Sequence, residues 1–228
     1  MNIQKIADNY TKLVKDVENY NKNVEIVVVT KYVKDVEILK KLYELGIENI
    51  AENYSQEMEY KFNTLKNNGF SPDNYNWHFI GHLQKNKVKK VVPLSYMIQS
   101  LDSLELAEKI NQQAKTLNKV QKCLVELKVS EEESKFGVKE EEIYNLIEKI
   151  NSMDFKNLVI CGLMTMAPYF EDPQLTRPYF KKAYNIFCEI RKKFPNFQIL
   201  SMGMSNDYKI ALEEGSNMLR IGNLLFKN

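Results

Sequence analysis

The sequence of 228 residues predicts a (β/α)8 barrel, also called a TIM barrel, because short apolar runs alternate with amphipathic helical patterns along its whole length. Eight such strand–helix units in about 200 residues match the small end of this α/β fold. A doubly wound open sheet is the alternative. Its first strand is normally followed by a glycine-rich phosphate turn, and here that strand ends in Thr-Lys-Tyr. No linker or change in composition divides residues 1–228, so we expect a single domain.

The chain begins with a helical pattern over Ile3–Tyr20, in which Ile6, Tyr10, Leu13 and Val17 are three or four residues apart. We therefore expect an extra N-terminal helix ahead of the barrel. The apolar runs that follow are the eight expected strands. They lie at Val24–Lys31, Ile47–Asn53, Asn76–Gly81, Tyr96–Leu101, Lys122–Val129, Leu158–Met164, Phe197–Gly203 and Met218–Gly222.

Amphipathic patterns lie between the strands, and local signals mark several of their ends. Gly46 and Gly215 each follow a helical pattern, where a left-handed residue commonly closes the last turn. Ser103 is suited to cap the helix that follows it, and Pro195 lies just beyond a helix that it cannot continue. The helices are expected near Asp35–Leu45, Ser55–Asn67, Gln84–Val91, Ser103–Leu117, Lys139–Asn151, Gln174–Lys193 and Asp207–Glu214, with a last short segment, Leu224–Phe226, under the N-terminal helix.

The composition is that of an ordinary globular protein, with 44% hydrophobic residues, 27% charged residues and a net charge of +2. This balance supports neither nucleic-acid nor membrane binding, and the most basic stretch, Lys85–Lys90, fits the solvated face of a short helix. Cys123, Cys161 and Cys188 lack the paired spacings of a disulfide framework or a zinc site, so we expect no metal. The N-terminal residues lack the apolar core of a signal peptide. These features favour a cytoplasmic protein.

Polar residues collect at the C-terminal ends of the expected strands, which is where a (β/α)8 barrel carries its chemistry. Lys31, at the end of the first strand, is the most informative of them. Burial at a strand tip would favour a neutral, nucleophilic amine that can form an imine with an aldehyde. The alternative is a rim lysine whose amine reaches water.

The seventh and eighth strands end in two glycine turns, in the part of such barrels that often binds phosphate. Leu200–Ser205 supplies hydroxyls and a glycine, and Ile221–Asn223 supplies a second glycine. Backbone amides in such turns hold anions well, although single glycines also make simple tight turns. A phosphate site beside an imine-forming lysine fits pyridoxal 5′-phosphate (PLP). It also fits a phosphorylated sugar in a lysine-dependent aldolase.

Seven stretches of the chain, in order from the first strand to the last, resemble the pyridoxal phosphate homeostasis proteins, which are similar to the barrel domain of alanine racemase. The stretches that begin Trp-His-Phe-Ile-Gly and Leu-Ser-Met-Gly-Met-Ser are the most specific. The resemblance implies the fold type III barrel of PLP-dependent enzymes without its C-terminal β domain. The stretches are Val28–Lys31, Glu52–Glu57, Trp77–Lys87, Glu133–Gly137, Gly162–Thr165, Leu200–Ser205 and Gly215–Gly222.

The resemblance also implies which residues contact the cofactor and its ring. Lys31 would hold PLP as an internal aldimine. Asn53, His78 and Ile80 would border the ring. Arg220 would contact either the pyridine nitrogen or the phosphate, and the sequence does not decide between them. An arginine at the ring nitrogen would leave it unprotonated and weaken the ring as an electron sink.

The same resemblance implies a phosphate site formed by two segments. They are Ser201 with the backbone of Met202 and Gly203, and the backbone of Gly222 and Asn223.

Three positions depart from the family pattern, namely Ala51, His82 and Lys128, where glycine, a small residue or proline, and asparagine are more usual. Glu126 and Lys128 are two residues apart on the fifth strand, so an inward ion pair is one account of Lys128. The other account is a second cation that acts on Lys31. None of the three is a predicted cofactor residue.

The resemblance leaves open whether the protein turns over a substrate. Alanine racemase takes its second base, a tyrosine, from a C-terminal domain and the partner subunit. This sequence ends soon after the eighth strand, and strand parity points Tyr32 away from Lys31, with Tyr54 harder to exclude. We therefore expect no catalytic residue, and a monomer that holds PLP for intracellular PLP homeostasis and serves PLP-dependent apoenzymes. The alternatives are a minimal racemase-like PLP enzyme that uses His78 or His82, a sugar-phosphate aldolase, and a non-catalytic scaffold.

Overall fold

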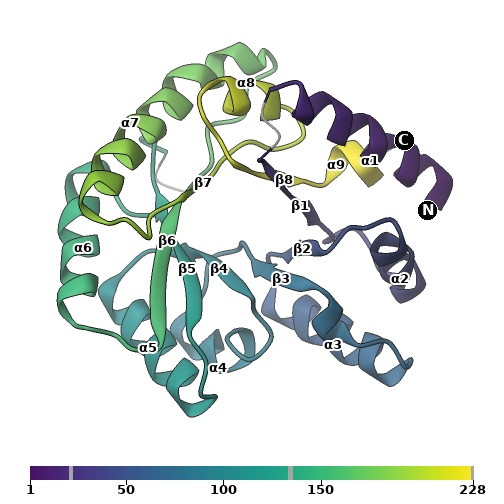
Figure 1. Ribbon diagram of the computed structural model, residues 1–228, viewed down its shortest axis with the longest axis horizontal. Helices are drawn as coiled ribbons and strands as arrows, with labels where there is room; N and C mark the ends of the chain where they lie inside the picture. The colour runs from purple at the N-terminus through teal and green to yellow at the C-terminus, as the bar shows by residue number, and fades with distance from the viewer. Residues whose placement is uncertain (21–22, 133–135, 227–228) are drawn as a thin grey trace.

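The computed structural model describes residues 1–20, 23–132 and 136–226, and its strands close into one parallel barrel in sequential order (Figure 1). Parallel pairing of the first strand with the eighth completes the ring. The predicted (β/α)8 architecture is therefore confirmed. The strands are β1 Glu25–Val29, β2 Asn49–Glu52, β3 Asn76–Phe79, β4 Met97–Leu101, β5 Gln121–Leu127, β6 Leu158–Thr165, β7 Ile199–Ser201 and β8 Met218–Ile221.

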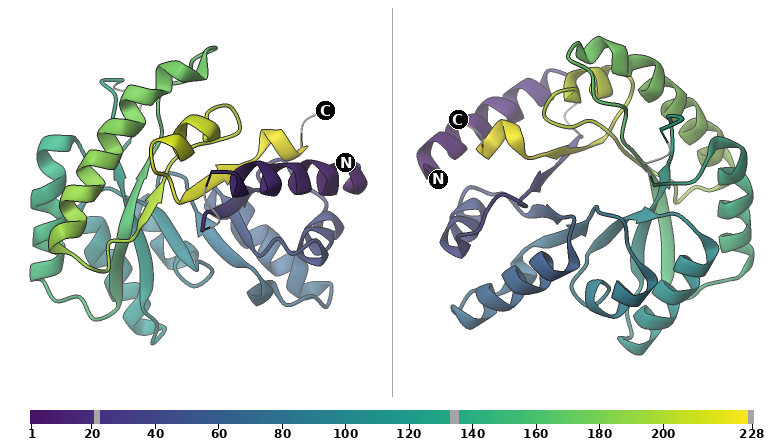
Figure 2. Two further views of the ribbon diagram at one scale, coloured as in Figure 1. Left: turned by 45° about the horizontal axis from the view of Figure 1, so that its top comes forward. Right: turned by 180° about the vertical axis from the view of Figure 1, so that it is seen from behind.

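The helices lie outside the ring, as both views of Figure 2 show. Two of the expected helices begin with a 3-10 turn: η2 Lys85–Lys87 precedes α4 Val88–Val91, and η3 Pro173–Thr176 precedes α7 Arg177–Lys193. The others are α1 Ile3–Glu18, α2 Val36–Glu44, α3 Ser55–Asn67, α5 Leu104–Thr116, α6 Glu140–Ser152, α8 Tyr208–Glu213 and α9 Asn223–Phe226, with a further 3-10 turn, η1, at Pro72–Asn74.

Several helix ends confirm the local signals. Ser103 accepts a hydrogen bond from the N–H of Leu106 as the N-cap of α5. Gly46 and Gly215 have φ of +80° and +91°, which is the left-handed conformation expected after α2 and α8. The prediction that the last segment packs under the N-terminal helix is also confirmed, since Asn9 of α1 donates a hydrogen bond to the carbonyl of Leu225 in α9 at 3.4 Å. The first and last described helices, α1 and α9, consequently lie side by side (Figure 2).

Six expected strands extend beyond the observed C-terminal ends, and four of them do so by two residues. β1 ends at Val29 rather than Lys31, β3 at Phe79, β5 at Leu127 and β7 at Ser201. Side chains alternate between the two faces only while the backbone stays extended. Inferences from strand parity therefore fail for the residues just beyond these ends, which are the residues that form the mouth of the barrel.

The core has two parts, separated by the strands. The larger part lies between strands and helices and includes Trp77, Phe180 and Phe197. The smaller part fills the lumen with apolar side chains from six strands: Val27, Val29, Ala51, Met97, Leu124, Met164 and Met218. These side chains fill the barrel interior, and a (β/α)8 barrel carries its site beyond them, at the C-terminal strand ends.

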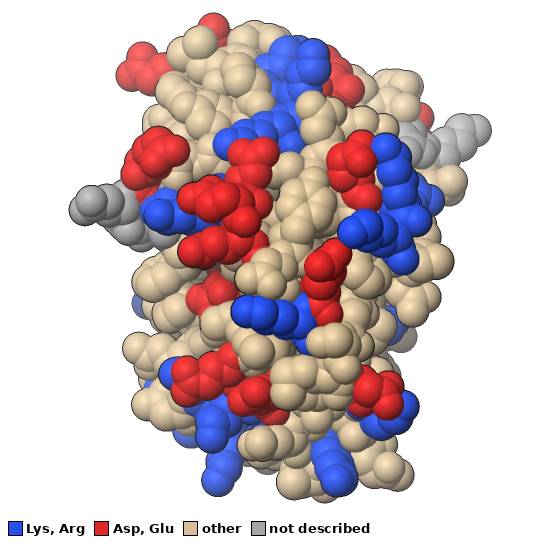
Figure 3. Space-filling view, turned by 90° about the vertical axis from the view of Figure 1, so that its left-hand side faces the viewer, with Lys and Arg blue, Asp and Glu red and all other residues tan. Residues whose placement is uncertain are grey.

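The outer surface mixes both signs of charge on the face that includes α6 and α7 (Figure 3). Ion pairs join the two helices, with Lys182 to Glu140 at 2.5 Å and Lys193 to Glu148 at 2.9 Å. On this face the described residues form no basic stripe of the kind that binds nucleic acid. No described helix combines the length and the hydropathy needed to span a membrane.

Candidate functional site

A cavity of about 420 Å³ opens at the C-terminal ends of the strands, where the sequence places the site. Its wall is formed by the loops after β1, β2, β3, β6, β7 and β8, together with side chains of β5 and β8. Six of the ten predicted cofactor residues line this cavity, namely Lys31, Asn53, Ile80, Arg220, Gly222 and Asn223. The other four, His78, Ser201, Met202 and Gly203, are buried in the barrel and are not among the lining residues.

Lys31 lies in the turn that follows β1 and lines the cavity with an exposed side chain. The expectation that this lysine is buried at a strand tip is therefore wrong, because β1 stops two residues earlier. Its Nζ lies 5.1 Å from the ring centroid of Tyr32, within the range of a cation–π contact. Tyr32 also lines the cavity, which corrects the inference that it points away.

A buried ion pair that the sequence did not predict fixes the backbone beneath Lys31. Lys61 of α3 is 1% exposed, and its Nζ lies 2.5 Å from Oε1 of Glu52 and 2.8 Å from the carbonyl oxygen of Thr30. The hydroxyl of Thr30 donates to the same carboxylate oxygen at 2.6 Å. Burial raises the pKa of Glu52, and the charge of Lys61 opposes this shift. The three residues join α3 to the ends of β1 and β2, which carry Lys31 and Asn53.

A chain of polar side chains crosses the barrel just below the cavity and accounts for His78 and Ser201. Nδ1 of His78 lies 2.9 Å from Nε2 of Gln99, and the Oε1 of Gln99 accepts a hydrogen bond from Ser201 at 2.7 Å. Burial, together with the charge of Lys122, lowers the pKa of His78 to about 3. His78 is therefore neutral at physiological pH, buried, and positioned to support this chain of hydrogen bonds. The structure does not place it at the cavity wall.

Arg220 connects this polar layer to the cavity. Its Nη1 donates to the hydroxyl of Ser201 at 2.6 Å, and its Nη2 donates to the carbonyl of Thr165 at 2.8 Å. Burial lowers the pKa of Arg220 to about 10, while Asp207 and Glu126 act in the opposite direction. The guanidinium is therefore a fixed cation in the cavity wall at neutral pH.

The residues after β7 that line the cavity lie further along the chain than the sequence predicts. Gly203 has a φ of +95°, and a Cβ there would lie 2.6 Å from the Cβ of Ala211, so this residue makes a tight turn against α8. The residues that reach the cavity are the next three, Met204 to Asn206. The hydroxyl oxygen of Ser205 accepts hydrogen bonds from the N–H groups of Gly222 at 3.3 Å and Leu224 at 3.1 Å. The two predicted glycine segments thus meet through Ser205.

His82 and Glu126 also line the cavity. Nδ1 of His82 lies 3.4 Å from Oδ2 of Asp102, and its ring stacks on Phe136 with centroids 3.8 Å apart. Lys128 lies elsewhere, in a separate hollow of about 230 Å³ that includes Glu131 and Lys139. The inward pair of Glu126 and Lys128 is therefore not found among the described residues, because β5 ends at Leu127 and parity no longer applies.

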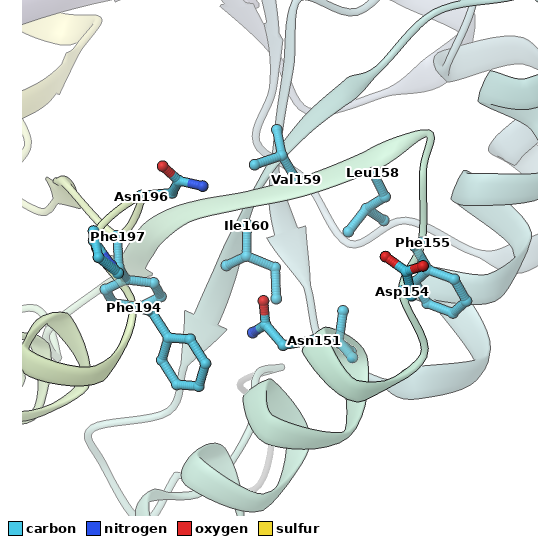
Figure 4. Close-up of a pocket in the computed structure, with 11 residues that line it drawn as sticks. Asn151, Asp154, Phe155, Leu158, Val159, Ile160, Phe194, Asn196 and Phe197 are labelled. Atoms are coloured by element: carbon cyan, nitrogen blue, oxygen red, sulfur yellow. The ribbon is translucent and has the colours of Figure 1, made fainter.

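The structure contains another hollow, away from this cavity. A second hollow of about 370 Å³ lies near the start of β6, at the opposite end of the barrel, and is lined largely by apolar side chains and amides (Figure 4). Asp154 is its one ionisable lining residue, so this hollow offers little chemistry.

The described residues contain no group of three or more His, Cys, Asp or Glu arranged to hold a metal ion. Of the stretch Glu133–Gly137, residues 133–135 lie outside the described residues.

Comparison with known proteins first defines the class. The family model described as "Alanine racemase, N-terminal domain" matches residues 1–228. The fold agrees: an alanine racemase of Clostridium difficile 630 has a TM-score of 0.75 at 18% identity, covering 97% of this chain and 60% of that one. This protein is a barrel of the alanine racemase type.

Relatives define the family more narrowly. The pyridoxal phosphate homeostasis protein of Aquifex aeolicus (strain VF5) is 40% identical over 192 residues, covering 83% of this chain and 81% of that protein. The human protein of the same name is 37% identical over 209 residues, covering 88% and 75%. The chain belongs to the pyridoxal phosphate homeostasis protein family, as its sequence stretches predict.

Solved structures of one relative are similar over nearly the whole chain. PipY of Synechococcus elongatus PCC7942 without PLP has a TM-score of 0.86 at 28% identity, covering 97% of this chain and 99% of that one. The same protein with PLP bound has a TM-score of 0.85 at 27% identity with the same coverage.

Proposed function

We propose that this protein binds PLP in the cavity at the C-terminal strand ends and acts in intracellular PLP homeostasis, without catalytic turnover. One observation carries the proposal: the amine of Lys31 and the two glycine segments joined by Ser205 border the same cavity. PLP needs an amine for its aldehyde and hydrogen-bond donors for its phosphate. The names of the relatives and the PLP-bound PipY structure support the same conclusion.

The phosphate end of the cavity fits a phosphate group. The N–H of Gly222 donates to the hydroxyl of Ser205 at 3.3 Å, which holds the two segments together at this end of the cavity, and a Cβ on Gly222 would make a tight contact with Val29 at 3.3 Å. We assign the phosphate to the Ser205 segment and the Gly222–Asn223 backbone, rather than to Ser201, Met202 and Gly203. The hydroxyl of Ser201 is already bonded to Gln99 and Arg220.

The ring end of the cavity fits as well. The Oδ1 of Asn53 is buried and has no hydrogen-bond partner among the described residues, so it is free to accept a bond from a ligand. Ile80 and Met166 supply apolar contacts for a flat ring. Lys31 would hold the aldehyde end of PLP through its amine, which borders the cavity. When bound, PLP supplies an electron sink for carbanion chemistry.

The remaining parts of the proposal concern the cellular role. We propose a monomer that keeps free PLP low and gives the cofactor to PLP-dependent apoenzymes, because the cavity is open to solvent at the C-terminal ends of the strands. A cytoplasmic location is supported by three free cysteines, which suit a reducing compartment.

A titration with PLP and with pyridoxal tests the proposed binding. We expect the purified protein to develop a visible absorption band with PLP at a one-to-one ratio. Pyridoxal, which lacks the phosphate, should bind more weakly by about a hundredfold, because charge-assisted hydrogen bonds to the phosphate are lost. Equal affinity for the two aldehydes would contradict the assignment of the phosphate site.

A minimal racemase-like enzyme is the second candidate, and one observation favours it. His82 lines the same cavity as Lys31 and has Asp102 beside its Nδ1, which is an arrangement suited to a general base. His78 no longer qualifies, since it is buried and its pKa is about 3. Racemisation of an amino acid at an enzyme-like rate, lost in His82→Gln and kept in His78→Gln, would establish this candidate in place of the binding protein.

Gly81 provides a separate test of the ring end of the cavity. A Cβ on Gly81 would lie 2.1 Å from the carbonyl oxygen of Asn53, so Gly81→Ala must displace the segment that holds Asn53. We expect PLP affinity to fall about tenfold or more, measured by absorbance titration. Gly46→Ala is the matched control, because nothing lies near its Cβ and it only strains a left-handed turn. It should cost about 1 kcal/mol of stability and leave PLP affinity unchanged. Equal affinity in the two variants would refute this.

A further inference from the structure

Glu126 is a buried acid in the cavity wall that neither the fold nor the proposed binding mode explains. Its side chain lines the cavity, although the residue is only 4% exposed. Its carboxyl group makes no hydrogen bond or ion pair with any residue that the structure describes. A carboxylate in such a place normally has a partner, because desolvation of a charge is costly.

The backbone around Glu126 holds the carboxyl in place. Its carbonyl accepts a hydrogen bond from the N–H of Val138 at 2.7 Å, and a Cβ on Gly137 would come within 3.2 Å of its Cγ. Its neighbour on β6 in the strand register is Met164, which offers no polar group to pair with. The backbone on both sides of this carboxyl is thus fixed, and the Gly137 backbone lies close to its side chain.

The charged groups around Glu126 have opposing effects. Burial and the charge of Asp102, after β4, raise its pKa, and Arg220 on β8 lowers it, with a net value of about 7. Lys31 and His82 line the same cavity. Glu126 is thus poised to gain or lose a proton near neutral pH when the charge in the cavity changes.

We propose that Glu126 couples ligand binding to proton uptake, so that the cavity takes up a phosphate-bearing ligand together with one proton from solvent, which adds to the Glu126 carboxylate. This inference rests on the proposed function, because it requires an anionic ligand in this cavity. A phosphate carries close to two negative charges at pH 7. In a cavity of this size those charges disfavour the ionised carboxylate and favour the neutral acid.

The sign of the pH dependence follows from this linkage. Below pH 6, Glu126 is already protonated in the free protein, and binding does not depend on it. As the pH rises above 7, Glu126 in the free protein loses this proton. The ligand then binds beside the negative charge of Glu126, or Glu126 takes a proton from solvent when the ligand binds. Affinity therefore falls as the pH rises, by up to tenfold for each unit by which the ligand raises the pKa of Glu126.

Calorimetric titration with pyridoxine 5′-phosphate tests the inference. This ligand has the phosphate and ring but no aldehyde, so it leaves the Lys31 amine unmodified. Titrations from pH 6 to 9, in buffers that differ in ionisation enthalpy, give both the affinity and the number of protons taken up. We expect Glu126→Gln and the unmodified protein to bind equally at pH 6. At pH 8.5 we expect Glu126→Gln to bind about tenfold more tightly and to take up fewer protons.

Asp102→Asn provides a second variant that leaves the cavity wall intact. Removing the negative charge of Asp102 makes Glu126 a stronger acid, so we expect the loss of affinity to begin at a lower pH than in the unmodified protein. This result stays informative if Glu126→Gln fails to fold. Identical proton uptake and pH profiles in all three proteins would overturn the inference. Absence of binding at every pH would instead contradict the proposed function.

Discussion

Lys61→Met is expected to lower the free energy of unfolding by about 3–5 kcal/mol, because it leaves the buried carboxylate of Glu52 without its cation. Lys61 is the cation that compensates Glu52 in the interior, and methionine fills a similar volume without the charge. Glu52 already has one carboxylate oxygen, Oε2, without a partner. Without Lys61 it becomes a buried charge with one hydrogen bond from Thr30. Urea denaturation at pH 7 measures the change.

The control and the pH dependence distinguish this mechanism from a general loss of packing. Lys66→Met changes an exposed lysine on the same helix and should alter stability by less than about 0.5 kcal/mol. In Lys61→Met, the neutral form of Glu52 is favoured, so its pKa is raised in the folded state. Stability is then present at low pH and lost as the pH rises through that pKa, and the deficit should shrink toward pH 4. A deficit independent of pH, or equal to that of Lys66→Met, would contradict the ion-pair account.

The second large effect is expected at Lys31. Lys31→Ala removes the amine that borders the cavity, and PLP should then bind only through its phosphate and ring contacts. We expect its affinity to fall by about a hundredfold or more, with the visible band shifted to that of free PLP. The affinity for pyridoxine 5′-phosphate, which forms no covalent bond, should change by less than about threefold. Lys34→Ala is the control, because Lys34 is exposed in the same loop but does not line the cavity. A similar loss in both variants would point to a general charge effect.

The sequence predicts the fold well because its signals are periodic and local. Each expected strand is present, since runs such as Ile26–Val29 are apolar throughout and can only be buried in a parallel sheet. The predicted strand ends are less accurate. A residue just beyond the last hydrogen bond between two strands can be of the same type as a residue within the strand, so the sequence does not mark the boundary. An overestimate of two residues at β1 was enough to misplace the side chains of Lys31 and Tyr32.

The site was predicted in part, and the errors have physical causes. Asn53, Ile80 and Gly222 line the cavity because family stretches fix their positions relative to the strand ends. Ser201 and His78 are not among the residues that line the cavity, because sequence cannot tell a polar residue that faces a cavity from one that satisfies another buried polar group. The Lys61–Glu52 pair was missed for a related reason. The two residues are nine apart, and only the packing of α3 against β1 and β2 brings them together.

Identifying the site of covalent attachment tests the central claim most directly. The protein would be incubated with PLP, reduced with borohydride and digested, and the modified peptides identified by mass spectrometry. We expect one pyridoxyl phosphate group per chain, attached to Lys31, and no adduct in Lys31→Ala. Attachment spread over surface lysines such as Lys34 and Lys66, or a single adduct elsewhere that persists in Lys31→Ala, would contradict the assignment of this cavity as the PLP site.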